Sequence, residues 1–211
     1  MANGNQSMIE DMPQIRILDR EVLYSSFNRV TNYRFEFESL SGAGKLLCEK
    51  EIFERKDAAA VVLYDNDRDR LLLVRQFRPG CFIKNGEAFP LEIVAGLIDK
   101  TNTPESTAIR ETEEESGCVV QKLIKIGSFF PEISFSTREI HMFCAKFDSS
   151  RFSSFGGLLE KEGEDVEVLL FSREEVEEKL RNGVIINSHS LIGLQWFFMN
   201  LPMVRQKFTE F

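Results

Sequence analysis

Apolar and polar residues alternate early in the chain, and the pattern over Val22–Phe53 is typical of β structure. The alternation is clearest in Tyr33–Glu38, which predicts a strand with one buried face. The turn residues Ser41–Lys45 indicate that Leu46–Phe53 returns antiparallel. We therefore expect a hairpin, preceded by a loose polar lead-in over residues 1–15. Because an isolated hairpin is only marginally stable in water, this hairpin should pack on another surface, such as a second subunit.

Two apolar runs further along, Ala58–Tyr64 and Leu71–Val74, predict a buried hairpin in the main sheet. Another strand is expected over Phe89–Val94, ending before Gly96. The remaining strands are expected at Lys122–Phe129, Ile140–Phe147 and Glu167–Phe171.

Three segments predict helices: Pro104–Ser116, Arg173–Arg181 and Ser190–Asn200. Thr103 and Ser172 are suitable N-caps for the first two, and Gly117 suits the end of the first. Helices interleaved with mixed strands predict an α+β fold, built as an α/β/α sandwich around a mixed sheet. We expect two parts, an N-terminal antiparallel β segment over residues 1–55 and a main domain over 56–211.

Composition and charge narrow the function. The net charge is −8 and the sequence pI is about 5.0, which argues against a broad nucleic-acid-binding surface. The four cysteines are far apart and form no CxxC pair, a pattern that favours reduced thiols in a cytoplasmic protein. The polar N-terminus has no signal-peptide core, and no apolar run approaches the roughly 20 residues needed to cross a bilayer.

The helix predicted at Pro104–Ser116 carries an unusual set of charges. Glu111, Glu114 and Glu115 stand at i, i+3 and i+4, so their side chains share one face and repel each other. A solvated acidic face is the simpler interpretation of these glutamates alone. A cation over that face is the alternative, and Mg²⁺ would suit the oxygen ligands.

The surrounding residues favour the cation, because the segment Gly96–Cys118 resembles the Nudix box, the signature of Nudix hydrolases. The matching positions are Gly96, Arg110, Glu111, Glu114, Glu115, Gly117 and Cys118. Two positions depart from the pattern: Asn102 replaces a glutamate, and Thr112 replaces an apolar residue. In the family the missing carboxylate helps to hold the box arginine, and such losses typically lower metal affinity or activity about 10- to 100-fold.

The similarity extends over roughly residues 22–198 and is strongest to the ADP-ribose pyrophosphatase branch. It is carried by Glu49–Arg55, Val74–Pro79, Leu91–Asp99, Gly156–Val168 and Leu194–Trp196. The resemblance implies Mg²⁺-dependent hydrolysis (with Mn²⁺ as an alternative ion) of ADP-ribose to AMP and ribose 5-phosphate. It also implies a homodimer formed through the N-terminal strands.

The resemblance assigns roles to individual residues. Glu111 and Glu115, with the backbone carbonyl of Ala95, would be the main metal ligands, and Glu114 a secondary one. The general base would be a loop glutamate, Glu162 or Glu164, with Glu162 preferred. Arg110 in the box is a further site residue. Arg75 and Arg78 follow a strand and could bind phosphate or ribose oxygens, which suits guanidinium geometry, and Phe27 or Tyr24 from the partner is a candidate for base stacking.

Alternatives remain for several of these roles. Arg75 and Arg78 fit surface ion pairs equally well. Core packing is the simpler interpretation of Phe27. Arg138 stands where the branch carries a carboxylate, as in a related UDP-sugar type, so UDP-glucose or another nucleoside diphosphate sugar is an alternative substrate. A non-catalytic Nudix-like ligand sensor is a further alternative, which the three retained glutamates disfavour.

Overall fold

The computed structural model describes residues 14–151, 158–159 and 164–210. Within these ranges the chain forms two compact units. One contains the N-terminal strands together with Glu132–Arg138, and the other contains Lys56–Pro131 and Glu139–Phe211. No helix among the described residues is long and apolar enough to span a membrane.

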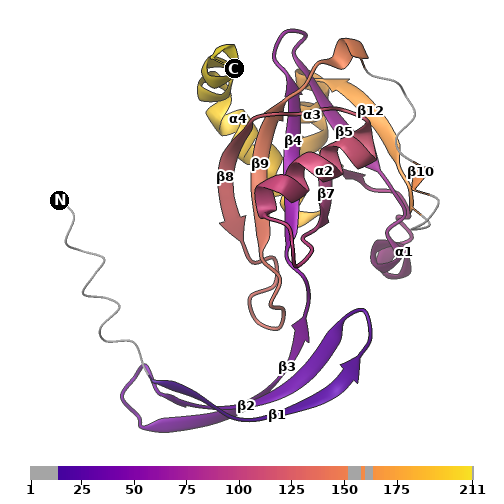
Figure 1. Cartoon of the computed structure of the whole chain (residues 1–211). Coiled ribbons are helices and arrows are strands. Elements are labelled where there is room, and N and C mark those ends of the chain that lie inside the picture. Colours follow the sequence, from indigo (N-terminus) through magenta and orange to yellow (C-terminus); the bar gives the residue numbers. More distant parts are fainter. Residues whose placement is uncertain (1–13, 152–157, 160–163, 211) are drawn as a thin grey trace, which may run out of the picture. The chain divides into compact units, whose positions relative to one another are not determined.

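The N-terminal unit is a three-stranded antiparallel sheet and not the predicted hairpin (Figure 1). Its strands are β1 (Ile15–Ser25), β2 (Arg29–Glu38) and β3 (Lys45–Glu54). The prediction missed most of β1 because two register shifts interrupt its pairing with β2 and its apolar residues do not keep a strict alternation. Between β2 and β3, Gly42 and Gly44 adopt φ angles of 74° and 96°, which side chains other than glycine rarely accept.

The main unit is built on a mixed sheet with the strand order β12-β5-β4-β9-β8. β4 lies in its centre, antiparallel to β5 and parallel to β9. The short strands β6 and β7 pair with β5 and β4. The strands are β4 (Ala58–Asp65), β5 (Arg70–Arg75), β6 (Leu91–Glu92), β7 (Val94–Leu97), β8 (Leu123–Phe129), β9 (Ile140–Lys146) and β12 (Glu167–Ser172).

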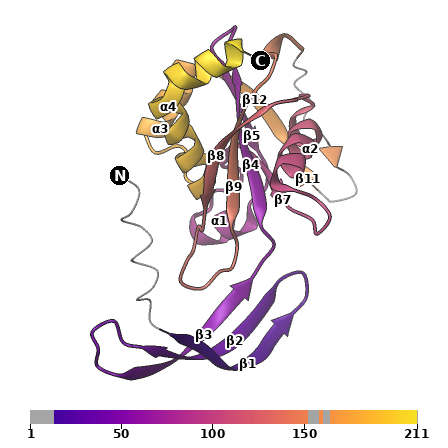
Figure 2. The ribbon, with the colours of Figure 1, turned by 60° about the vertical axis from the view of Figure 1, so that its left-hand side comes forward.

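Helices cover both faces of this sheet, which confirms the predicted α/β/α sandwich (Figure 2). Successive residues of β4 point to opposite sides, so Ala59 and Val61 pack in the same cluster as Ala108 of α2, whereas Ala60 and Val62 pack with Leu194 of α4. Every residue of β4 is buried, as expected for a central strand covered twice. The helices are α1 (Pro79–Asn85), α2 (Pro104–Ser116), α3 (Arg173–Arg181) and α4 (Ser188–Thr209).

The predicted element boundaries succeed where local signals set them. α2 and α3 have the predicted bounds, with Thr103 and Ser172 as N-caps and Gly117 in the left-handed conformation at φ 68°. α4 is much longer than predicted and continues through Pro202. The strand expected at Phe89–Val94 is instead divided into β6 and β7, with Gly96 inside β7.

A short strand pair completes the described structure: β10 (Leu158–Leu159) pairs with β11 (Glu164–Asp165). A 3-10 turn, η1 (Ser149–Arg151), precedes this region. Glu162 lies outside the described residues, and of Glu164 only the backbone in β11 is described.

Candidate metal and diphosphate site

The three box glutamates of helix α2 differ in how deeply they are buried. Glu111 and Glu115, one turn apart, retain only 9% and 2% of their exposure. The Glu114 side chain is 38% exposed and lies at the rim. Burying two carboxylates on one helix face is costly unless cations compensate them. The solvated acidic face considered from the sequence therefore does not describe Glu111 and Glu115.

Gly96 in β7 provides the space for the carboxylate of Glu111. A Cβ atom on Gly96 would lie 1.9 Å from Cδ and 2.1 Å from Oε1 of Glu111, far inside van der Waals contact. The glycine at the start of the box thus allows the helix carboxylate to rest against the strand backbone. Ala95, whose carbonyl is expected to contribute a ligand, is the preceding residue of β7 and pairs with Ala60 of β4.

Arg110 is held by the box glutamates themselves. Its Nη2 donates to Glu111 Oε1 at 2.6 Å and its Nη1 donates to Glu114 Oε2 at 2.5 Å, with a longer contact of 3.5 Å to the Leu97 carbonyl. Burial alone would lower the pKa of Arg110, but the charges of Glu111 and Glu114 more than offset this, so its pKa is raised. These contacts position Arg110 although residue 102 is asparagine.

A further carboxylate, Asp99, lies in the box segment close to Asn102. Asp99 accepts a 2.8 Å hydrogen bond from Lys56 Nζ, and the backbone carbonyl of Asp99 accepts from the Asn102 amide. The bond from Lys56 lowers the pKa of Asp99, and the positive charge of Arg110 lowers it further. Nothing in the sequence singled out Asp99, which stands three residues before the expected position.

The donor set suits a divalent cation with a strong preference for oxygen. Mg²⁺ is commonly held by one or two carboxylates together with waters and substrate phosphates. The described residues contain no group of three His, Cys, Asp or Glu side chains that already converge on one point. Glu111 and Glu115 with the Ala95 carbonyl therefore fit an ion that substrate phosphates and water would complete.

The two candidate substrate arginines differ sharply. Arg75 makes an exposed ion pair with Glu167 on the neighbouring strand β12, at 2.5 Å, as the ion-pair interpretation expects. Arg78 follows β5 and donates from Nε and Nη2 to the buried carboxylate of Glu92, at 2.7 and 2.6 Å. Arg78 is therefore anchored by a buried carboxylate and Arg75 by an exposed one, and a role of either in binding substrate stays a prediction.

Phe27 belongs to the N-terminal unit, between β1 and β2. It is 74% exposed and Tyr24 is 58% exposed. Core packing within the chain, the simpler interpretation of these rings, is therefore wrong. A role in base stacking stays a prediction.

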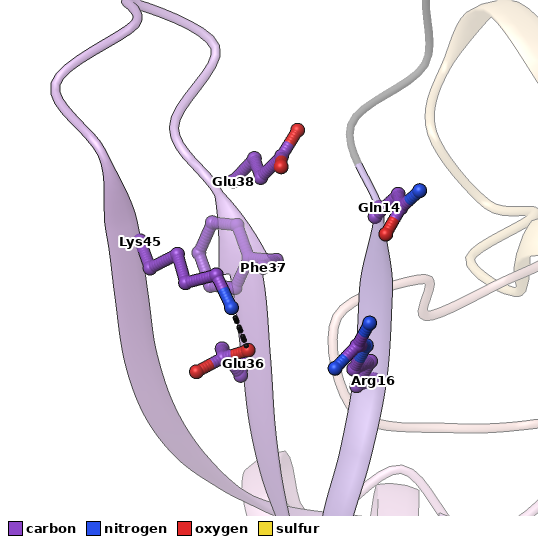
Figure 3. Close-up of a pocket in the computed structure, with 6 residues that line it drawn as sticks. All are labelled: Gln14, Arg16, Glu36, Phe37, Glu38 and Lys45. Atoms are coloured by element: carbon purple, nitrogen blue, oxygen red, sulfur yellow. Dashed lines mark hydrogen bonds and ion pairs between the residues drawn. The ribbon is translucent and has the colours of Figure 1, made fainter.

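A hollow across the three strands at one end of the N-terminal sheet is a weaker candidate site (Figure 3). Figure 3 shows Arg16, Glu36 and Lys45 among its lining residues, with Lys45 Nζ bonded to Glu36 at 2.8 Å. Arg16 also lies opposite Glu36 in the β1–β2 register. Positive and negative side chains here neutralise each other across the strands, which leaves little net charge for a ligand.

The chain is similar to several known proteins. An ADP-ribose pyrophosphatase of Haemophilus influenzae is 31% identical over 199 residues, covering 93% of this chain and 91% of the relative. One of Escherichia coli K12 is 32% identical over 195 residues, covering 92% and 93%. A GDP-mannose pyrophosphatase of Cronobacter sakazakii is 34% identical over 149 residues, covering 70% and 76%. The NUDIX domain model matches residues 54–200, which include the whole of α2, Gly96 and Arg78, and the chain belongs to the NUDIX family.

Proposed function

We propose that the chain hydrolyses the diphosphate of ADP-ribose, giving AMP and ribose 5-phosphate. The buried pair Glu111 and Glu115, with the Glu111 carboxylate seated against Gly96, carries this proposal. The substrate is supported by relatives named ADP-ribose pyrophosphatase that align over more than nine-tenths of the chain. GDP-mannose or another nucleoside diphosphate sugar is the second candidate, because the Cronobacter relative is named for that substrate.

The proposal gives separate residues the roles of metal ligand, phosphate binding and general base. Glu111, Glu115 and the Ala95 carbonyl would hold Mg²⁺ or Mn²⁺, with Glu114 as a secondary ligand. Such an ion neutralises phosphate charge and lowers the pKa of a bound water. Arg78 would bind a phosphate oxygen, since a guanidinium matches phosphate geometry, whereas Arg75 is less suited. Glu162, with Glu164 as the alternative, would accept the proton of the attacking water.

The N-terminal segment of residues 1–55, whose described part contains the sheet β1–β2–β3, would serve as a dimerisation segment. All eleven residues of β1 are exposed. Several large apolar residues of the sheet are at least 44% exposed, namely Ile15, Ile17, Leu18, Val22, Leu23, Leu46 and Leu47. Apolar surface on this scale is typical of an interaction site. A second copy of the chain is the occupant expected from the resemblance, and its Phe27 would then reach the base.

Replacing Ile17 and Leu23 together with aspartate is expected to dissociate the dimer, because both side chains are largely exposed in the isolated chain yet would be buried between copies. Analytical ultracentrifugation should give twice the chain mass of 24.3 kDa for the wild type and the single mass for the variant. Aspartates at Val119 and Met199, two exposed positions of the main unit, serve as the control. A monomeric wild type contradicts the proposal.

A cytoplasmic location is part of the proposal. All four cysteines are unpaired in the structure, and burial raises the pKa of the Cys118 and Cys144 thiols. Such thiols suit a reducing compartment.

A substrate panel tests the proposed activity. With Mg²⁺ or Mn²⁺ we expect ADP-ribose to be cleaved with the highest kcat/KM, ahead of GDP-mannose, UDP-glucose and diadenosine compounds, and chromatography should show AMP as a product. A preference for GDP-mannose would show that the proposed substrate is wrong and that the proposed reaction, hydrolysis of a diphosphate, is right. Binding of these compounds without turnover of any of them would instead favour the ligand-sensor alternative.

A further inference from the structure

The carboxylate of Glu92 is a buried junction between three parts of the main unit. Glu92 ends β6, lies opposite Val74 of β5 and has a side chain only 4% exposed. Its Oε2 accepts both Nε and Nη2 of Arg78, and its Oε1 accepts the Nδ2 of Asn187 at 2.5 Å. Each oxygen thus has its own donor, which is the condition for burying such a charge.

Asn187 joins this junction to helix α4 through both ends of its amide. Its Oδ1 accepts from the Ser190 amide and caps the helix, and its Nδ2 donates to Glu92. One turn into the helix, Ser190 Oγ accepts from the amide of Ile93, the residue after Glu92. The first turn of α4 therefore holds the segment that leads into Ala95 and Gly96.

Arg78, the other partner of Glu92, is held through one side of its guanidinium group only. Arg78 uses Nε and Nη2 for the carboxylate, and its backbone amide donates to the Ala88 carbonyl at 2.9 Å. Among the described residues, none bonds to Nη1 of Arg78, and the side chain is 34% exposed. An arginine anchored in this way keeps a donor for a ligand while losing little rotamer freedom on binding.

We propose that Asn187 and Glu92 are positioning residues that orient Arg78 toward a substrate phosphate, with Asn187 setting the orientation of the Glu92 carboxylate from the N-cap of α4. This inference rests on the proposed function, because it assigns Arg78 to the diphosphate. It adds that phosphate affinity depends on a helix cap 109 residues further along the chain. A buried carboxylate paired with an arginine contributes little net stability compared with apolar packing, so accurate placement of Arg78 is the better reason for this pair.

The test uses Asn187→Ser, because removing Glu92 itself would leave the Arg78 charge beside an apolar sheet. Serine is as good an N-cap as asparagine but is too short to donate to Glu92. We expect the dissociation constant of inorganic pyrophosphate, measured by calorimetry without divalent ions, to rise about tenfold. The KM for ADP-ribose with Mg²⁺ should rise similarly while kcat stays within about twofold, as for the loss of uniform binding.

Ser190→Ala is the matched control, since it breaks the neighbouring tie to Ile93 and leaves the Glu92 carboxylate untouched. It should lower the melting temperature and leave the pyrophosphate affinity, which is measured without divalent ions, unchanged. Equal affinities in the wild type and the Asn187→Ser variant, or equal losses in both variants, would overturn the positioning role. The proposed function is refuted if the wild type hydrolyses none of the compounds in the substrate panel. The pyrophosphate affinities would still test the positioning role in that case, because they do not depend on turnover.

Discussion

Glu115→Gln is expected to lower metal-dependent hydrolysis of ADP-ribose more than about 100-fold. Residues that only orient the metal ligands typically cost about 10- to 100-fold, so a larger loss indicates a ligand. Glu115 is 2% exposed and lies one turn from Glu111, so its carboxylate is a buried charge that a bound cation would stabilise. Glutamine has nearly the same shape and preserves the packing while removing the charge. The melting temperature without metal should therefore stay close to that of the wild type, or rise.

Glu113→Gln is the matched control, because Glu113 lies on the same helix but is exposed. It makes the same chemical change and should leave turnover within about twofold, as surface substitutions usually do. The informative measurement is kcat/KM over a Mg²⁺ titration, together with the melting temperature with and without Mn²⁺. Wild-type turnover, or a wild-type stabilisation by Mn²⁺, in the Glu115→Gln protein would remove Glu115 from the metal site.

Local chemistry explains which elements were predictable. α2 begins after Thr103, whose side chain accepts from the Ser106 amide, and ends at Gly117 in the left-handed conformation, so both ends are encoded within a few residues. α3 has the same kind of start, with Ser172 and Glu175 capping each other. Signals of this range can be read without knowing the fold.

Elements that depend on tertiary contacts were missed or misjudged. α1 starts at Pro79 with no side-chain cap and has no buried residue, so no periodic pattern marks it. α4 extends well past its predicted end because Val204 and Phe208 pack in the core beyond Pro202, and this packing offsets the hydrogen bond that proline cannot donate. β1 is a fully exposed strand in the chain, which gives it no core face to reveal.

In the candidate site, too, features encoded by local spacing were predictable and features set by tertiary contacts were not. Motif spacing placed Gly96 and Glu111 in the same box without giving the glycine a role, and the structure brings the Glu111 carboxylate against the glycine. The Glu92–Asn187 bond joins residues 95 positions apart and uses side chains that are common in ordinary roles, so no spacing indicates it. Arg75 and Arg78 were equivalent in sequence, and only their different carboxylate partners separate them.

Gly96→Ala is expected to weaken Mn²⁺ affinity by about 10- to 100-fold, because displacing a ligand by 1 Å or more has effects of this size. Gly96 lies outside the left-handed region, so alanine suits the strand backbone and the effect is confined to the new methyl group. That methyl would stand 1.9 Å from Glu111 Cδ, which forces the carboxylate away from β7. The overpacking should also cost about 1–3 kcal/mol of unfolding free energy.

Gly80→Ala provides the control for this substitution. A Cβ on Gly80 would meet no atom within 4 Å, and alanine in α1 should stabilise the helix by about 0.5–1 kcal/mol without changing Mn²⁺ affinity. Electron paramagnetic resonance of free Mn²⁺ gives the dissociation constant directly, independent of turnover. If the Gly96→Ala protein binds Mn²⁺ as tightly as the wild type, Glu111 does not need its place against β7 to hold the ion. The contact between strand and helix would then be a packing feature, and the metal site would have to be centred on Glu115 and Glu114.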